Sequence, residues 1–560
     1  MNRSLLSNRI YLHQFAIAIL FTALYLGCGK PDATTSKSND DSNSSDQSAA
    51  HSNTGDSKTN SPTQKKQATT TPKRKKKSAS KIVKKSFSSA DTDGSFSAAK
   101  SFDGKPKVNL VKAIWDYGLE SQLSNPTVVV WLFDVSQSAT ALRSKVVSGI
   151  RSTPKVSDGQ MFESMVVTYS DGPISLVSEE PTKDFVKLSE QLTSIEASTT
   201  EGEKTFAALN ETAKKFGPLR RIDRKSLIVV LVTDEAGDDS QEATDNGNTQ
   251  LEDAIANFKK FSMPLFVIGN PAPFGRAVDA PEATTKNLTY GPESVYSERI
   301  NIGTWDGSTE LDRFDSGFGP WGLERLCRQS GGRYLADRPE ARSARLVSRM
   351  QSNWPIVMSQ QFKDSIMSRY KPFYGTHDDY KSDLQSNKAK LALHNAAKRP
   401  NTQVYRIQNY EFGAGNEAQL VREINSAQRT PAVIRPGLEK LYGILKEGES
   451  DRENLKSKRW QAGYDLAYGR VLANYIRVVV LNTMLAEMKG GKTFSNPANN
   501  RWVLEPSDEV STGSGDKRLA EKAKMYLTRV TAEHPGTPWA KIAEKELERP
   551  LGWKWTEAQR

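Results

Sequence analysis

The sequence predicts an α/β protein with a doubly wound, mostly parallel six-stranded sheet, helices on both faces of that sheet, and an all-α C-terminal region. Two apolar runs, Thr127–Phe133 and Ser226–Val232, are typical of strands that are buried on both faces. Around them, apolar residues recur three or four positions apart, which is the spacing of one helix face. Strands that alternate with helices favour a parallel sheet. After Met350 the pattern is helical throughout.

The length of 560 residues is too great for a single core and favours about three or four units. Of the net charge of +12, ten basic residues lie between Lys65 and Lys85 without an acid, so the rest of the chain carries only 12 − 10 = +2. We expect five segments. These are a signal peptide (1–27), a tether (28–105), an α/β domain (106–350) with an insertion (270–319), a helical linker region (351–430) and a helical domain (431–560).

The N-terminus has the pattern of an export signal. Two arginines precede an apolar run, Phe15–Leu26, which is shorter than the ~20 apolar residues of a membrane-spanning helix. The run ends at Gly27-Cys28 and resembles the lipobox of bacterial lipoproteins, which implies that Cys28 carries the lipid. The alternative is an ordinary signal peptide that is cut nearby. Either predicts an exported protein, and the first predicts anchoring to the cell membrane or outer membrane.

Residues 29–105 are rich in Ser, Thr, Asp, Asn and Lys and contain few large apolar residues. Such a segment cannot bury enough surface to offset its ordering entropy, so we expect a disordered tether. Its basic tract has no interleaved aromatic residues, which argues against nucleic acid as a partner. Contact with anionic lipid head groups or cell-wall polymers, or a solvated spacer without a partner, are the remaining alternatives.

The predicted elements of the α/β domain follow in order. A helix begins at Leu110, the first strand is Thr127–Phe133, and a helix carries Leu142, Val146 and Ile150 on one side. Asp171-Gly172 predicts a hairpin turn between two further strands. The remaining elements are a helix from Phe206, the strand Ser226–Val232, and then the segments 251–261 (helix), 264–268 (strand), 321–329 (helix) and 332–335 (strand).

Polar oxygen-bearing residues follow the first strand. Asp134, Ser136 and Ser138 lie where a strand gives way to a helix, which in an open α/β sheet is the usual place for a ligand. One carboxylate and two hydroxyls form a hard-oxygen set that suits Mg²⁺ better than zinc or copper.

Asp-Val-Ser-Gln-Ser after the first strand and Val-Thr-Asp after the fourth resemble the von Willebrand factor type A (VWA) fold over about residues 108–350. The resemblance implies a metal-ion-dependent adhesion site that holds Mg²⁺, or another divalent cation such as Ca²⁺ or Mn²⁺, with Asp134, Ser136, Ser138 and Asp234 as matching residues. The family's second loop supplies a threonine. Here Glu203 stands at that position and Thr205 follows two places later, so either could be the ligand.

The insertion 270–319 is long for a loop without secondary structure and leaves the domain on the side of the metal loops. Cys327 has apolar neighbours, and we expect it to be a core thiol. In the C-terminal region we expect polar helices near 379–398 and 416–427 and stronger helices at 438–445 and 460–488. A final hairpin, 519–533 with 539–547, resembles a tetratricopeptide-like unit.

No combination of nucleophile and base has a recognisable spacing, so we do not expect an enzyme. The first hypothesis is a lipid-anchored cell-envelope VWA protein that binds a protein partner's Asp or Glu through the metal site. The second is a structural scaffold that acts through the helical C-terminal region, with a vestigial metal site. A hydrolase that uses the insertion is the third.

Overall fold

The computed structural model describes residues 110–154, 156–157, 159–198, 203–275, 292–300, 302, 314–338, 361–399 and 410–559. The chain divides into two compact units, Met1–Val83 and Lys84–Arg560, and every described residue belongs to the second. The expectations for the signal peptide, Cys28 and the tether therefore lie outside the described residues, as do residues 276–291 and 303–313 of the insertion.

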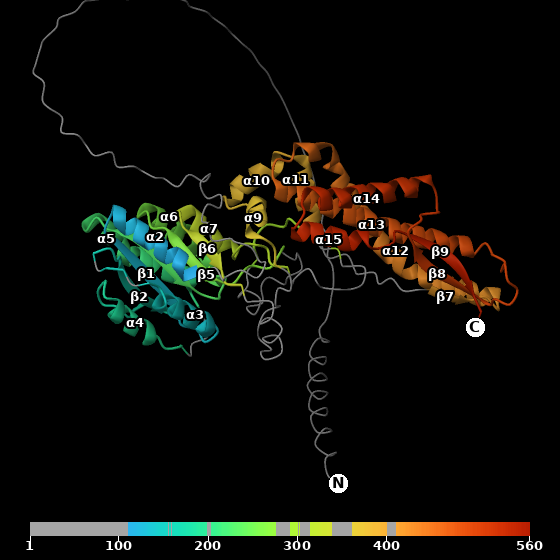
Figure 1. Cartoon of the computed structure of the whole chain (residues 1–560). Coiled ribbons are helices and arrows are strands. Elements are labelled where there is room, and N and C mark those ends of the chain that lie inside the picture. Colours follow the sequence, from blue (N-terminus) through green and yellow to red (C-terminus); the bar gives the residue numbers. More distant parts are fainter. Residues whose placement is uncertain are drawn as a thin grey trace, which may run out of the picture. The chain divides into compact units, whose positions relative to one another are not determined.

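The first half of the described chain forms a six-stranded sheet of order β3-β2-β1-β4-β5-β6, in which all pairs are parallel except the β2–β3 hairpin (Figure 1). This confirms the predicted mostly parallel sheet. The strands are β1 Thr127–Asp134, β2 Glu163–Tyr169, β3 Ser175–Leu176, β4 Ser226–Val232, β5 Leu265–Gly269 and β6 Arg333–Ala336. Every residue of β1 is buried, as expected for a strand covered on both faces.

Helices cover both faces of this sheet. On one face Trp131 and Phe133 of β1 pack with α2, α3 and α4, whereas Val130 and Leu132 face α5, α6 and α7 on the other. The helices are α2 Leu110–Ser124, α3 Thr140–Arg151, α4 Phe185–Thr193, α5 Thr205–Ile222, α6 Gln250–Lys260 and α7 Trp321–Ser330. Gly331 ends α7 with φ +88°, as its position after the helix predicted. Cys327 is fully buried in α7, which confirms a core thiol.

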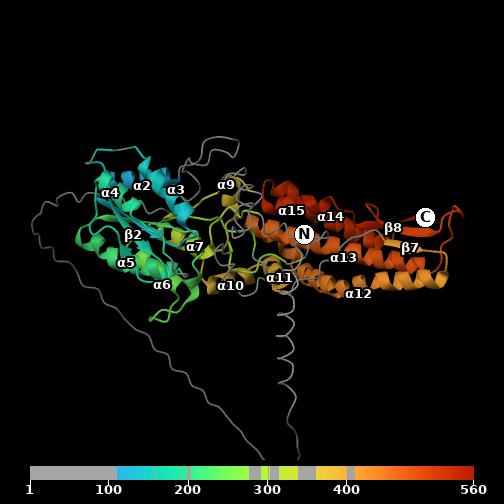
Figure 2. The same ribbon diagram turned by 90° about the horizontal axis from the view of Figure 1, so that it is seen from below.

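The C-terminal region is helical, but the expectation that it is all-α was wrong. Besides its helices it contains a three-stranded antiparallel sheet of order β7-β8-β9 (Figure 2). The strands are β7 Tyr410–Gly413, β8 Arg501–Ser507 and β9 Gly552–Ala558. Trp553 and Trp555 alternate with polar residues along β9, and together with Trp502 and Leu504 of β8 they join the helical core.

The longer helices of the C-terminal region are α10 His377–Gln385, α11 Lys388–Ala397, α12 Glu417–Glu447, α13 Lys458–Met488, α14 Ser514–Glu533 and α15 Pro538–Leu547. The two helices predicted at 416–427 and 438–445 are therefore one, and the boundary expected at residue 430 falls inside it. Pro431 and Pro436 lie inside this helix, although a proline inside a helix costs about 3 kcal/mol. The buried stripe from Leu420 to Leu445 continues past them, and each buried aliphatic side chain contributes about 1.5–3 kcal/mol.

Helix α13 is the only helix among the described residues that is long and apolar enough to span a membrane, and 67% of its most apolar window is buried inside the protein. It packs against α12, α14, α15 and β9. Its buried charged residues are paired inside the protein. Asp465 accepts hydrogen bonds from Arg452 and Arg529, and Glu546 pairs with both Arg470 and Arg477. We therefore describe α13 as the core helix of the C-terminal region.

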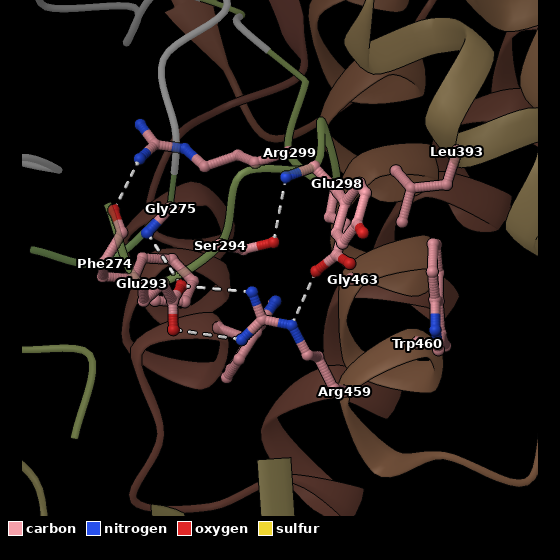
Figure 3. A pocket seen from close by; sticks show the side chains of 12 residues that line it. Phe274, Gly275, Glu293, Ser294, Glu298, Arg299, Leu393, Arg459, Trp460 and Gly463 are labelled. Atoms are coloured by element: carbon pink, nitrogen blue, oxygen red, sulfur yellow. Dashed lines mark hydrogen bonds and ion pairs between the residues drawn. The ribbon is translucent and has the colours of Figure 1, made fainter. Parts of the chain in front are cut away.

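The described parts of the insertion are well packed. Phe274 lies edge-on to Trp539 of α15 with ring centroids 4.7 Å apart, and Tyr296 stacks on Tyr380 of α10 at 3.7 Å. Figure 3 shows Glu293 and Glu298 of the insertion on either side of Arg459, at the start of α13. The insertion thus joins the α/β domain to the helical region through contacts that the sequence did not predict.

Candidate metal centre

The residues predicted to form the metal site meet at the carboxyl ends of β1 and β4, which are neighbours in the sheet. The Ser136 and Ser138 hydroxyl oxygens are 3.1 Å apart, and the Ser138 hydroxyl donates to the Asp234 carboxylate at 3.3 Å. Asp134 and Ser136 are buried, and Asp234 retains 9% exposure. Four of the six predicted residues therefore form one connected group of oxygen atoms.

Asp134 is held rigidly. One of its carboxylate oxygens accepts from the Ser136 backbone N–H at 2.8 Å and the other from the Thr233 hydroxyl at 2.7 Å. On the far side of the loop, the buried Arg143 guanidinium of α3 donates to the backbone carbonyls of Asp134 and Ser136, at 2.7 and 3.3 Å. The loop conformation is thus fixed by side chains that the sequence analysis did not single out.

The structure separates the two residues that the sequence left as alternatives. Thr205 is the first residue of α5, is fully buried, and its hydroxyl lies 3.2 Å from the hydroxyl of the buried Tyr169. Glu203 is half-buried, and its carboxyl group lies close enough to Asp134, Asp234 and Glu235 to interact with them electrostatically. The Thr205 hydroxyl therefore has a partner in the core, whereas Glu203 belongs to the group of Asp134, Ser136 and Asp234.

The carboxyl groups at this edge of the sheet, the carboxyl ends of β1 and β4, raise one another's pKa. Burial, together with the charges of Asp134 and Asp234, raises the pKa of Glu203 to about 7. Burial and Asp134 raise the pKa of Asp234 to about 6, and burial with Glu203 and Asp234 raises that of Glu235 to about 9. Burial also raises the pKa of Asp134. Without a cation, the group therefore retains protons near neutral pH, which is expected where acids lie close together in a partly buried site.

The donor set can be compared with the needs of a divalent cation. Within the described residues, no three Asp, Glu, His or Cys side chains converge closely enough to hold a metal ion by themselves. The acids are near enough to interact electrostatically, but a cation here would need the serine hydroxyls as well. Hydroxyl and carboxylate oxygens are ligands that Mg²⁺ accepts, usually together with several waters. The residues present fit such an ion, with Asp134, Ser136, Ser138, Asp234 and Glu203 as the available oxygens.

Two further acids support the edge without belonging to the predicted set. Asp239 accepts from the backbone N–H groups of Phe206 and Ala207, at 3.0 and 2.8 Å, and so caps the start of α5 beside Thr205. Glu235 follows Asp234 directly, and burial together with the charge of Glu203 raises its pKa. Its position in the sequence, immediately after Val-Thr-Asp, could have identified Glu235 as a residue of this site.

The start of the insertion contacts the site. The Asn270 side-chain amide donates to the Asp234 backbone carbonyl at 3.1 Å, and the Asn270 carbonyl accepts from the Tyr334 hydroxyl at 2.7 Å. The insertion therefore leaves the sheet beside Asp234 before it reaches the helical region, which is the side on which the sequence placed it.

Comparisons with known proteins do not place the chain in a family. No protein-family model matches the sequence, and no curated protein matches it either. Among solved structures, proximal thread matrix protein 1 of the mussel byssus is 15% identical with a TM-score of 0.19, and covers 26% of this chain and 36% of its own. The human COPII-coat protein Sec24c is 10% identical with a TM-score of 0.24. That match covers 72% of this chain and 57% of Sec24c. The chain spans well under two thirds of either, and neither similarity is strong enough to support an argument.

Proposed function

We propose that the chain is an exported, lipid-anchored protein of the VWA type in the cell envelope, which binds a protein partner through a divalent cation. The observation that carries the proposal is the hydrogen-bonded group of Asp134, Ser136, Ser138 and Asp234 at the carboxyl ends of two adjacent parallel strands. The strand order, with helices on both faces, is compatible with such a domain.

The chain's own residues have distinct parts in this function. Asp134 is oriented by Ser136 and Thr233, and Arg143 holds the loop from behind, so the oxygens do not need to reorganise when an ion arrives. When bound, a divalent cation would supply a positive centre for an Asp or Glu carboxylate of the partner. Binding of this kind needs no nucleophile or general base, and the proposal does not include an enzymatic reaction.

Glu203 gives the proposed site an unusual charge. Three ionised carboxylates, Asp134, Asp234 and Glu203, carry three negative charges against the two positive charges of the ion. Such a site holds its ion well but attracts a further carboxylate weakly, because like charges that lie close together repel. We therefore propose that Glu203, rather than Thr205, is the remaining ligand of the site, and that its carboxylate acts as an internal substitute for the partner's carboxylate.

Calorimetric titration of Mg²⁺ tests the proposal. Ser138→Ala and Glu203→Thr should each weaken ion binding about tenfold to a hundredfold, the range known for residues that support a metal. Glu203→Thr should also bind a carboxylate-bearing partner more tightly than the wild type. Glu242→Gln is the matched control, because this exposed acid lies at the same edge and pairs with Lys204 instead.

Two outcomes would contradict the proposal in different ways. Unchanged ion affinity in Glu203→Thr, together with a large loss in Thr205→Val, would show that Thr205 is the ligand. If the wild type does not bind Mg²⁺, Ca²⁺ or Mn²⁺, the second candidate is favoured, namely a structural scaffold that acts through the helical C-terminal region. The observation that favours this candidate is the lack of three converging acids within the described residues. Crosslinking on intact cells with and without a chelator distinguishes the two candidates, because a scaffold keeps its partner when the metal is removed.

A further inference from the structure

Two large apolar side chains protrude at the end of the sheet opposite the candidate metal centre. Leu123 is 79% exposed and Ile222 is 76% exposed, the highest values for large apolar residues in the described part of the chain. Leu123 lies shortly before β1 and Ile222 shortly before β4. Thr127 and Ser226, the first residues of these strands, are paired, and the Ser226 N–H donates to the Pro126 carbonyl at 2.7 Å. The two loops are therefore neighbours at the amino ends of the strands.

Basic residues gather at the same end of the sheet, near Ile222. Helix α5 ends with Arg220 and Arg221, and α6 ends with Lys259 and Lys260. Arg221 and Lys260 both lie over the ring of Phe261, at 5.6 and 5.3 Å from its centroid, so the ends of these helices meet. The exposed Arg224 follows α5, and the exposed Arg333 begins β6.

Acids do not neutralise this end of the sheet. Lys225 is paired with Glu163 at 2.7 Å. The remaining acids are Asp223, beside Arg220, Arg221 and Arg224, and the exposed Glu120, one helical turn before Leu123, so the basic residues are in excess. At the other end of the same strands lie Asp134, Glu203, Asp234 and Glu235. The domain is therefore electrically polar along its strands, with a basic amino end and an acidic carboxyl end.

The backbone of these loops is also unusual. Arg224 and Ser262, with φ of 57° and 50°, are the only residues other than glycine in the left-handed region within the described residues. Arg224 comes directly after the C-cap of α5, and Ser262 directly after that of α6. Glycine is the residue that usually takes this position. An arginine in this strained conformation, two residues after Ile222, adds an exposed positive charge to this end of the sheet.

We propose that this amino-end surface, formed by Leu123, Ile222 and the surrounding arginines and lysines, binds the surface of an anionic lipid bilayer. Protruding apolar side chains that enter the head-group region, flanked by Arg and Lys that meet lipid phosphates, are the features of interfacial membrane binding. A soluble polyanion would use the positive charges but gain nothing from Leu123 and Ile222. The combination of the two features favours a lipid surface.

The proposal goes beyond the lipid anchor, because it assigns membrane contact to the folded domain itself. It also has a geometric consequence. Strand β1 has eight residues and so spans about 26 Å. With its amino end on a bilayer, the domain would hold Asp134 and Asp234 away from the lipid surface and open to a partner.

Vesicle sedimentation tests this with the chain from residue 28 onward carrying Cys28→Ser, so that neither the signal segment nor a lipid contributes. The vesicles contain phosphatidylcholine with or without phosphatidylglycerol. Leu123→Ser/Ile222→Ser should lower binding to the anionic vesicles roughly tenfold, since two apolar side chains no longer leave water. Arg221→Gln/Arg224→Gln should lower binding to the anionic vesicles about fivefold for each charge removed, and less at high salt.

The control Val433→Ser/Met525→Ser removes two exposed apolar residues from α12 and α14 and should have no effect. All variants keep the basic tract 65–85, so its contribution is constant.

A site-specific readout distinguishes the domain from the basic tract. Cys327 is buried, so an environment-sensitive fluorophore on Ile222→Cys reports this surface alone. Its emission should shift to the blue with anionic vesicles, whereas the label on Val433→Cys should not respond. If the label at position 222 stays unshifted although the protein sediments, the tract alone binds the membrane and the proposal is wrong. Undiminished binding by Leu123→Ser/Ile222→Ser, with loss only in the arginine variant, would identify a surface for soluble polyanions instead.

Discussion

Replacing Arg459 with methionine should strongly destabilise the junction between the insertion and the helical region. The Arg459 guanidinium is buried and donates to Glu298 at 2.7 Å and to both oxygens of Glu293 at 3.1 and 3.2 Å. Glu293 is fully buried. Methionine fills a similar volume, so the main effect of Arg459→Met is to leave two carboxylates without their counter-charge.

The size of the effect follows from these contacts. Two unit charges 4 Å apart interact by about 4 kcal/mol at an effective dielectric constant of 20, and Arg459 makes two such pairs. The repulsion between the two carboxylates and the cost of burying the guanidinium make the net stabilisation smaller than the total for the two ion pairs. Removing one partner of a buried ion pair costs about 3–5 kcal/mol in free energy of unfolding. We expect Arg459→Met to lie in that range.

The loss should depend on pH in a defined direction. Burial raises the pKa of Glu298, and Arg459 opposes the rise. Without Arg459 that pKa rises further, so the folded variant binds a proton more tightly than the unfolded chain does. Stability of the variant relative to the wild type should then be greater at pH 5 than at pH 8, because protonation removes the unpaired charge.

Urea unfolding, followed by tryptophan fluorescence at pH 5 and pH 8, measures both effects. Trp460 and Trp539 line the small pocket of about 20 Å³ next to Arg459 and report on this region (Figure 3). Arg459→Met/Glu293→Gln/Glu298→Gln should recover most of the lost stability, and Lys541→Met, in an exposed pair with Glu544, is the control. A change below about 0.5 kcal/mol in Arg459→Met, or an equal loss at both pH values, would refute the reasoning.

Four further predictions follow from the structure and the sequence. Because the pKa of Glu203 is raised to about 7 and that of Glu235 to about 9, the folded site binds more protons than the unfolded chain. The stability of the metal-free protein should therefore fall between pH 6.5 and pH 8.5. In melting experiments, Mg²⁺ should raise the stability more at pH 8.5 than at pH 6.5. Thr205→Val removes the hydroxyl that lies 3.2 Å from the buried Tyr169 hydroxyl and should cost about 1 kcal/mol in urea unfolding while Mg²⁺ affinity is retained. Cys28→Ser should move the protein from the membrane to the soluble fraction, and retention after a high-salt wash would place the anchor elsewhere. A chain that begins at Lys105 should melt at the same temperature as one that begins at residue 28, and a clear loss would show that the tether docks on the body.

The sheet was predictable because its signal is local. Thr127–Phe133 and Ser226–Val232 are continuous apolar runs, and such runs have few alternatives to a buried strand. The small sheet was missed because β8 includes Pro506 and its partners are far apart in the sequence. Part of its signal was nevertheless present, since apolar and polar residues alternate from Trp553 to Thr556.

The candidate site was predictable to the extent that it follows strand ends. Asp134, Ser136, Ser138 and Asp234 come together because parallel neighbours end at one edge. Which of Glu203 and Thr205 faces that edge was not predictable, because it depends on the core position of Tyr169, which engages the threonine hydroxyl. Likewise, no local pattern connects Glu293 with Arg459, which are joined only when the insertion folds against α13.

The buried arginines of α13 have a consequence for how the protein would reach the envelope. An exported chain crosses the membrane unfolded, and the segment Lys458–Met488 then presents a stretch apolar enough to stop and remain in the bilayer. A charge at the centre of a membrane helix costs about 2.5–3.5 kcal/mol, so Arg470 and Arg477 together oppose insertion by about 5–7 kcal/mol. After folding, the same side chains donate to the carbonyls of Ile302 and Pro550 at 3.0 and 2.9 Å. In a chain exported as proposed, replacing both with leucine would therefore favour α13 as a stop-transfer segment, and the protein would be trapped during translocation before its fold could form.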